Sequence, residues 1–236
     1  MTNIASLPLL ALCSVLLWHT SLGTTTTASE RKSLLEGILR DHSSLVRPDG
    51  PESSSPVSVS ISYSLISIGK VELSTGLFET VGYLQLQWTD PRLAFRSDFA
   101  SALRVDPAII WTPDIELYNS APPGLTILNR KNVAIVSPDG QVRWIPMVAI
   151  PSVCDMTSDG APASLNCTLQ FGSWTFTGFD VDLDVPSSAV DLNGYIPNRS
   201  WEVVNTSASR RVDYYPCCPD PFPLVSFSIV INKKLD

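Results

Sequence analysis

Two adjacent cysteines, Cys217 and Cys218, lie between Tyr215 and Phe222 in the segment 214–222, which also holds three prolines. A disulfide between chain neighbours closes a small ring across one peptide bond, outside the usual Cα spacing of about 4.4–6.8 Å. Such a ring, together with the fixed φ of each proline, leaves a loop few conformations. The segment therefore predicts a stiff loop tip that presents sulfur and aromatic rings to a ligand.

The N-terminal residues 1–23 predict a secretory signal peptide. An apolar run at 7–17 is followed by small residues at 20–23, which is the pattern of a cleavage site. The run is short for a membrane span, although a membrane anchor is the alternative. We therefore expect a secreted, extracellular protein whose mature part is one domain, residues 24–236.

After removal of that segment four cysteines remain: Cys154, Cys167, Cys217 and Cys218. An even number in a secreted chain favours disulfides, and four cysteines allow three pairings. The simplest pairing joins Cys154 to Cys167 and Cys217 to Cys218. Pairing between the two groups, or free thiols at Cys217 and Cys218, are the alternatives.

Three N-glycosylation sequons also fit secretion; the candidate acceptors are Asn166, Asn198 and Asn205. The net charge of −7 argues against a nucleic-acid partner, which requires a basic face. It is compatible with a cationic ligand.

Catalytic and metal-binding patterns are weak. Beyond the signal segment the chain has a single histidine, His42, which any Ser-His-Asp or Cys-His arrangement would have to use. Three aspartates, Asp180, Asp182 and Asp184, alternate along one stretch and could attract Ca²⁺, but a solvated outer face is the simpler interpretation. We predict no enzyme, no cofactor and no metal site.

The hydrophobic pattern predicts an all-β fold. Residues 30–42 show one apolar face and predict a helix, and residues 43–56 predict a loop. Apolar residues then alternate with polar ones, which is typical of strands. The expected strands are 57–65, 84–88, 133–136, 142–148, 165–171, 179–185, 201–206 and 224–232, with a turn at Ser137–Gly140. This spacing predicts an immunoglobulin-like β-sandwich of about ten strands with an N-terminal α-helix.

Two further stretches carry aromatic residues of interest. Trp174 lies at the end of an expected strand, in Gly172–Phe176, where a tryptophan is usually buried but, if exposed, could hold a cation. The stretch Trp111–Asp114, followed by Tyr118, indicates a turn with a buried tryptophan.

Together these motifs carry a family resemblance. Trp111-x-Pro113-Asp114, Cys154-x12-Cys167, Gly172–Thr175 and Tyr215-x-Cys217-Cys218 resemble the extracellular domain of nicotinic Cys-loop ligand-gated ion channels. The absence of a long apolar run after the signal segment, and a cysteine loop one residue shorter than in channel subunits, resemble the soluble acetylcholine-binding proteins of molluscs.

The resemblance implies a homopentamer that binds acetylcholine or a related cation between subunits, without a membrane span. On the principal face it implies Tyr118, Ser173, Trp174, Tyr215, Cys217, Cys218 and Phe222. On the complementary face it implies Tyr83, Arg143 and Ile145.

Three residues depart from the family pattern. Phe222 replaces a tyrosine, Tyr83 replaces a tryptophan, and Arg143 stands where an apolar residue is common. A guanidinium near a cation site repels the ligand unless an acid pairs with it. We therefore expect acetylcholine binding with altered selectivity among nicotinic ligands.

Three functions remain open from the sequence. The first is a soluble protein that buffers acetylcholine outside cells. The second is a truncated channel subunit, which a longer transcript with four apolar spans would reveal. The third is a secreted β-sandwich that serves as a carrier or structural protein and whose ligand site is vestigial.

Overall fold

The computed structural model describes residues 27–49, 55–96, 100–129, 131–154 and 164–234. The expected signal segment and most of the loop between Cys154 and Cys167 lie outside these residues. Within the described ranges, no helix has the length and apolar character that crossing a membrane requires.

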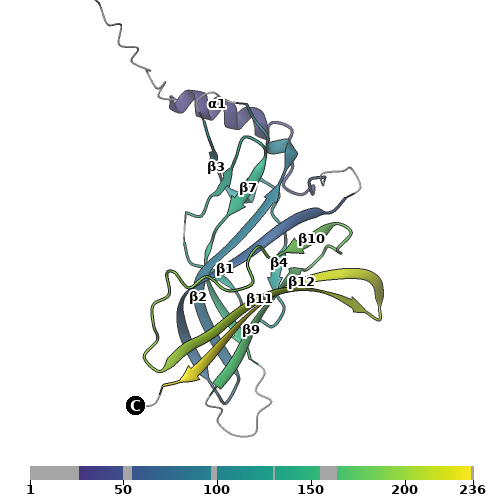
Figure 1. The fold of residues 1–236 in the computed structure, drawn as a ribbon. Helices are drawn as coiled ribbons and strands as arrows, with labels where there is room; N and C mark the ends of the chain where they lie inside the picture. The colour runs from purple at the N-terminus through teal and green to yellow at the C-terminus, as the bar shows by residue number, and fades with distance from the viewer. Residues whose placement is uncertain (1–26, 50–54, 97–99, 130, 155–163, 235–236) are drawn as a thin grey trace, which may run out of the picture.

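One α-helix, α1 (Ala28–Leu39), lies at one end of the molecule (Figure 1). Thr27 and Glu30 form a capping box: the Glu30 amide donates to Thr27 Oγ1 (3.2 Å), and the Thr27 amide donates to the Glu30 carboxylate (2.8 Å). This cap starts the helix before the predicted residue 30. The predicted apolar face is confirmed, because four of its residues pack against the core: Leu34, Leu35, Ile38 and Leu39.

The helix ends three residues before the predicted His42. The chain turns at this point and His42 folds inward, where its Nε2 accepts a hydrogen bond from the Trp111 amide (3.3 Å). Burial lowers the pKa of His42. His42 therefore ties the helix end to the body of the fold.

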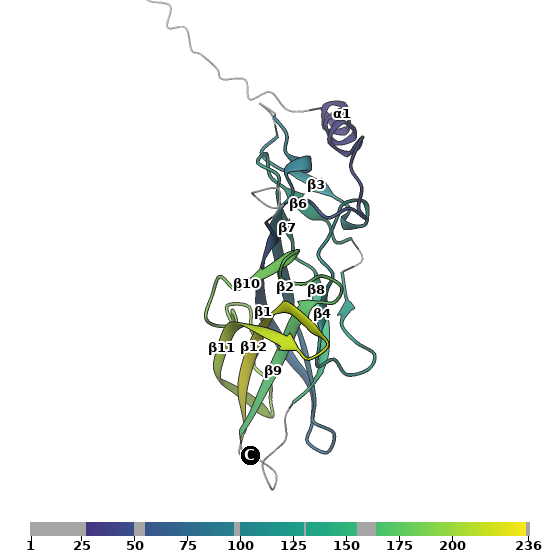
Figure 2. The same ribbon diagram turned by 90° about the vertical axis from the view of Figure 1, so that its right-hand side faces the viewer.

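Two sheets form the sandwich, as predicted (Figure 2). The larger sheet has the strand order β10-β1-β2-β7-β6-β3, with β8 beside β2 and β5 beside β8. Its strands are β1 (Val57–Glu72), β2 (Leu77–Thr89), β3 (Leu103–Val105), β5 (Thr126–Ile127), β6 (Ala134–Val136), β7 (Gln141–Trp144), β8 (Met147–Val153) and β10 (Val181–Asp184). The smaller sheet has the order β11-β12-β9-β4, with β4 (Ile115–Leu117), β9 (Ser164–Ser173), β11 (Trp201–Tyr215) and β12 (Cys218–Lys233).

The core lies between the sheets, where period-two alternation turns one face of each strand inward. On β1 the alternating apolar residues from Val57 to Leu65 are buried, as predicted. Tyr63 reaches across to Phe227 of the smaller sheet, with ring centroids 6.0 Å apart. Its hydroxyl donates to Thr80 Oγ1 (2.8 Å), which satisfies the buried polar atom.

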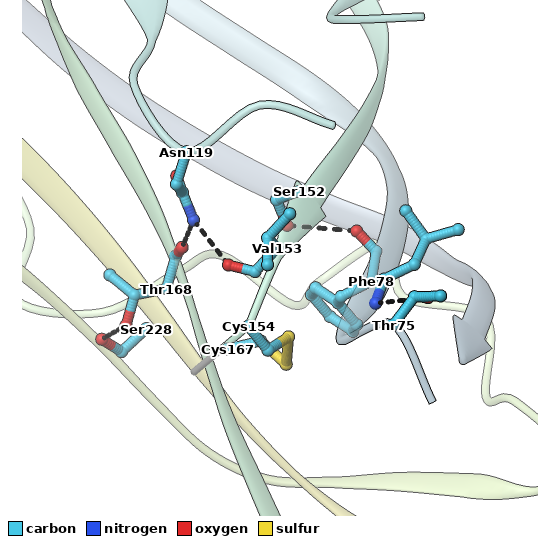
Figure 3. The surroundings of a disulfide bond; sticks show 10 residues. Thr75, Phe78, Asn119, Ser152, Val153, Cys154, Cys167, Thr168 and Ser228 are labelled. Atoms are coloured by element: carbon cyan, nitrogen blue, oxygen red, sulfur yellow. Dashed lines mark hydrogen bonds between the residues drawn. A yellow bond between two sulfur atoms is a disulfide. The ribbon is translucent and has the colours of Figure 1, made fainter. Parts of the chain in front are cut away.

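A disulfide joins the sheets covalently. Cys154, just after β8, bonds to Cys167 in β9, so this predicted pairing is confirmed (Figure 3). Beside it the amide of Asn119 donates to the carbonyls of Val153 (3.1 Å) and Thr168 (2.7 Å). The disulfide and the Asn119 hydrogen bonds thus both connect the end of β8 to β9.

Some strand limits differ from the prediction. The expected strand 142–148 is divided into β7 and β8 at Ile145–Pro146, because proline has no N–H to donate to the ladder. Strands β11 and β12 extend much further than predicted, to Tyr215 and back to Cys218. Residues 206–216 contain few apolar side chains, so their sequence lacks the alternation of apolar and polar residues that predicts a strand. Strands β3, β4 and β5 are too short to show one.

The predicted turn Ser137–Gly140 leads into β7. The Gly140 amide donates to the Ser137 carbonyl (2.9 Å), and the Gly140 carbonyl accepts from the Asp90 amide (2.9 Å). Gly140 has φ of 81°, and a Cβ there would collide with the Asp90 carbonyl.

We expect Gly140→Ala to lower the free energy of unfolding by about 2–4 kcal/mol, because left-handed backbone and the collision both penalise a side chain. Urea denaturation measures this. The matched control is Gly37→Ala in α1, where a Cβ meets nothing within 4 Å. It should be neutral or stabilising by up to about 1 kcal/mol. Equal effects of the two substitutions would contradict the role of the turn.

Candidate functional site

The carboxylate of Asp114 organises the end of β9. Its Oδ1 accepts from Ser173 Oγ (2.6 Å), and its Oδ2 accepts from both the amide and the hydroxyl of Thr175 (2.6 Å each). The Asp114 carbonyl accepts from the Trp174 amide (3.1 Å). Charge-assisted hydrogen bonds of this kind are the strong ones in proteins. The segment 173–175 therefore wraps around one carboxylate.

This wrapping turns the Trp174 side chain out of the core. Trp174 is 72% exposed, whereas its neighbour Ser173 is 5% exposed. A tryptophan this exposed has its π face available to a ligand. The sequence predicted that Trp174 could hold a cation only if it were exposed, and this condition is met. The exposure follows from the hydrogen bonds around it rather than from the local composition.

Tyr118 follows β4 and lies against the same segment. Its ring contacts Trp174 edge to face, with centroids 6.1 Å apart, and its hydroxyl donates to the Ser173 carbonyl (2.7 Å). The ring fits because Gly172 has no side chain; a Cβ there would lie 2.9 Å from the Tyr118 ring and hydroxyl. The carbonyl of Ser173, a residue predicted for the principal face, is thus already hydrogen-bonded to Tyr118.

The β11–β12 hairpin supplies the remaining aromatic rings. Tyr215 and Phe222 contact each other with centroids 5.2 Å apart, and Tyr215 is 40% exposed. At the tip Cys217 bonds to Cys218, so the vicinal pairing is confirmed and the free-thiol alternative is wrong.

The hairpin and the Tyr118 segment lie close enough to affect each other electrostatically. Burial raises the pKa of Tyr118, and after burial Tyr215, Asp114 and Asp213 raise it further. All seven residues predicted for the principal face lie on the smaller sheet or on the segments that directly follow its strands. We call Tyr118, Trp174, Tyr215 and Phe222 the aromatic cage.

The residues predicted for the complementary face lie on the other sheet. Tyr83 on β2 alternates with buried residues and is 40% exposed. Arg143 on β7 pairs with Gln87 of β2 and is exposed, and the same register continues past Ile145 into β8. Among the described residues, no hydrogen bond, ion pair or ring contact joins Tyr83 or Arg143 to the aromatic cage. One subunit thus does not bring the two groups together.

Asp114 and Thr175 are the site residues that sequence reasoning missed. The predicted burial of Trp111 is confirmed, since Trp111 is 3% exposed and packs edge to face on Trp88, whereas residues 111–114 are irregular rather than a turn. An aspartate after proline is a signal for side-chain hydrogen bonding at a turn. Its partner Ser173 lies 59 residues away, however, and no local pattern shows that contact.

The aspartates considered for Ca²⁺ do not form a site. Asp180 pairs with Arg47 (3.4 Å) and Asp182 with Arg210 (2.6 Å). In the described part of the chain no three His, Cys, Asp or Glu side chains are arranged to hold a metal ion. Two of these carboxylates thus act as ion-pair partners on the outer face.

The three sequons differ in their surroundings. Asn166 on β9 and Asn205 on β11 are exposed and both pair with Val230 of β12, so they lie on the same outer face. The Asn198 amide instead donates to the Ile68 carbonyl (3.0 Å) and its oxygen accepts from the Ser200 amide (2.8 Å). Glycan attachment stays a prediction at each.

We expect Asp114→Ala to lower the free energy of unfolding by about 2–4 kcal/mol, because three partners lose a charged acceptor. Urea denaturation measures the loss, and acrylamide quenching of tryptophan fluorescence should change as Trp174 leaves its fixed position. The control is Glu116→Ala, an exposed carboxylate two residues away. An Asp114→Ala protein as stable as the Glu116→Ala protein would contradict the organising role of Asp114.

The chain is similar to known proteins over most of its length. Residues 31–235 match the model of the neurotransmitter-gated ion-channel ligand binding domain. Acetylcholine receptor subunit alpha-type acr-16 of Caenorhabditis elegans is 27% identical over 230 residues, covering 95% of this chain and 46% of that protein. Neuronal acetylcholine receptor subunit alpha-6 of Rattus norvegicus is 32% identical over 184 residues (76% and 37%). Acetylcholine receptor subunit alpha-like 2 of Drosophila melanogaster is 29% identical over 219 residues (87% and 38%). The chain thus spans less than half the length of these relatives, and it belongs to the neurotransmitter-gated ion-channel ligand-binding domain family.

Proposed function

We propose that this chain is a secreted protein that binds acetylcholine and other nicotinic ligands between the subunits of a homopentamer. In this role it buffers extracellular transmitter and has neither enzymatic activity nor a pore of its own. The observation that carries the proposal is the exposed Trp174, held open by Asp114 and bordered by Tyr118.

The chemistry of the aromatic cage suits a quaternary ammonium ion. Such an ion donates no classical hydrogen bond, so it is recognised by aromatic faces, each contributing about 0.5–2 kcal/mol. Four rings on one face, with closure of the disulfide-stiffened tip, support micromolar affinity or better, about −8 kcal/mol. The name acetylcholine receptor, which the relatives carry, supports the same ligand class.

A second subunit supplies the missing wall in this proposal. The aromatic cage is open on the side where Trp174 and Tyr215 are exposed. Tyr83 and Arg143 are exposed on the other sheet of the same chain. Because each subunit carries both faces, copies arranged head to tail complete every site in a ring, which a heterologous interface forms when its rotation closes.

A piece of a channel subunit is the second candidate, and the observation that favours it is length. The chain spans less than half of the receptor subunits that it matches. A transcript that continues beyond residue 236 into four apolar spans would establish this candidate in place of the soluble buffer.

We expect acetylcholine and nicotine to produce a saturable change in tryptophan fluorescence, and Trp174→Ala to weaken binding at least tenfold through loss of a cation–π face. Because Trp174 is itself a reporter, calorimetry measures the affinity of the variant. Phe179→Ala is the control, since Phe179 is a 64% exposed ring outside the aromatic cage, a few residues further along the chain.

Light scattering on the same samples reports assembly. No response of the intact pentamer up to millimolar ligand would favour the structural-carrier function. Equal losses in the Phe179 and Trp174 variants would show that the effect is not specific to the aromatic cage.

Arg143 makes no ion pair among the described residues and would face the ligand from the complementary side. We expect Arg143→Leu to tighten acetylcholine binding about threefold to tenfold by removing a like charge. Gln87→Leu is the control, because Gln87 pairs with Arg143 on the same face but is uncharged. Unchanged affinity for every ligand tested in Arg143→Leu would remove the repulsion argument.

A further inference from the structure

A charged pair on β11, Arg211 and Asp213, lies beside the aromatic cage and has no role in the function described so far. The Arg211 Nε lies 3.0 and 3.2 Å from the two Asp213 carboxylate oxygens. Its other nitrogens donate to Ser226 Oγ on β12 (3.5 Å) and to Gln170 Oε1 on β9 (3.2 Å). The guanidinium is therefore attached to three neighbouring strands, and it holds the Asp213 carboxylate in place.

The strand register puts this carboxylate next to the aromatic cage. Asp213 lies directly opposite Phe222 in the β11–β12 ladder. Residues directly opposite share a face, with Cβ atoms about 4.5–5.5 Å apart. Phe222 in turn contacts Tyr215. The Asp213 side chain is 31% exposed, so it is partly removed from water and its field is less screened.

The charge of Asp213 is felt inside the aromatic cage. After burial and Tyr215, the carboxylates of Asp114 and Asp213 raise the pKa of Tyr118. The strand register at Phe222 gives the geometric basis for this effect. Asp114 differs from Asp213, since its oxygens accept hydrogen bonds from Ser173 and Thr175 at the end of β9.

We propose that Asp213 is a specificity-determining residue of this site: its carboxylate favours cationic ligands over uncharged ligands of the same shape, and Arg211 positions it. This inference rests on the proposed function and deepens it. A carboxylate on the principal face also offsets the repulsion expected from Arg143 of the neighbouring copy, because opposite charges on the two walls nearly cancel.

The test compares acetylcholine with its uncharged carbon analogue, 3,3-dimethylbutyl acetate, by calorimetry on the assembled protein. The readout is the affinity for acetylcholine divided by the affinity for the uncharged analogue. We expect Asp213→Asn to lower this ratio about fivefold, mainly by weakening acetylcholine, and Asp213→Glu to restore most of it. High salt should reduce the ratio in the wild type more than in Asp213→Asn.

Asp182→Asn is the matched control. Asp182 lies on β10 of the larger sheet and pairs with Arg210 of β11. The substitution therefore removes the same charge from a second aspartate–arginine pair. The affinity ratio of the Asp182→Asn protein should equal that of the wild type. An equal fall in both variants would assign the preference to net charge and overturn the inference.

The positioning role of Arg211 has its own readout. In an Arg211→Gln background, Asp213→Asn should change the ratio less than in the wild type, and Arg211→Lys should restore part of the difference. An equal effect in both backgrounds would remove Arg211 from the proposal.

The remaining outcomes separate this inference from the proposed function. If the wild type binds both ligands and Asp213→Asn leaves the ratio unchanged, the inference is wrong while the proposed function stands. If the wild type binds neither ligand, the proposed function fails and the inference fails with it.

Discussion

One carboxylate, that of Asp114, determines how the candidate site is built. It accepts three hydrogen bonds from Ser173 and Thr175, and its own carbonyl accepts the Trp174 amide. These contacts hold the chain where β9 ends, at Ser173, and leave the large aromatic ring of Trp174 exposed to solvent. Tyr118 then fits over Gly172 and donates to the Ser173 carbonyl, so the position of one ring sets that of the next.

The rest of the sandwich keeps these segments in register. The Cys154–Cys167 disulfide and the Asn119 amide tie β8 of the larger sheet to β9 of the smaller one (Figure 3). Tyr118 directly precedes Asn119, so the same short segment carries both a ring of the aromatic cage and the bridge between sheets. A shift of the sheets relative to each other would therefore move the site. This coupling explains why a binding surface made of loops needs a rigid body behind it.

Electrostatics divides the proposed site between its two walls. The principal wall carries two carboxylates near the rings, Asp114 and Asp213, and Asp213 is paired with Arg211. The complementary wall carries Arg143, which has no acid partner among the described residues. Because unit charges interact over several ångströms at the dielectric constants of protein surfaces, ligand preference depends on the balance between these walls as well as on ring contacts.

The sequence alone determined the all-β class, the N-terminal helix, the buried face of β1 and the family, because period-two alternation, the cysteines and the aromatic motifs are local patterns. Only the tertiary structure decided that Trp174 is exposed, that Asp114 holds it there, and that β11 and β12 extend to Tyr215 and Cys218. It also placed Asp213 opposite Phe222 and showed that one subunit holds Tyr83 and Trp174 on different sheets. The exposure of Trp174 depends on contacts between residues about 60 positions apart, which leave no period in the sequence. The end of the β11–β12 hairpin pairs residues that are close in the chain, but its few apolar side chains leave no period either.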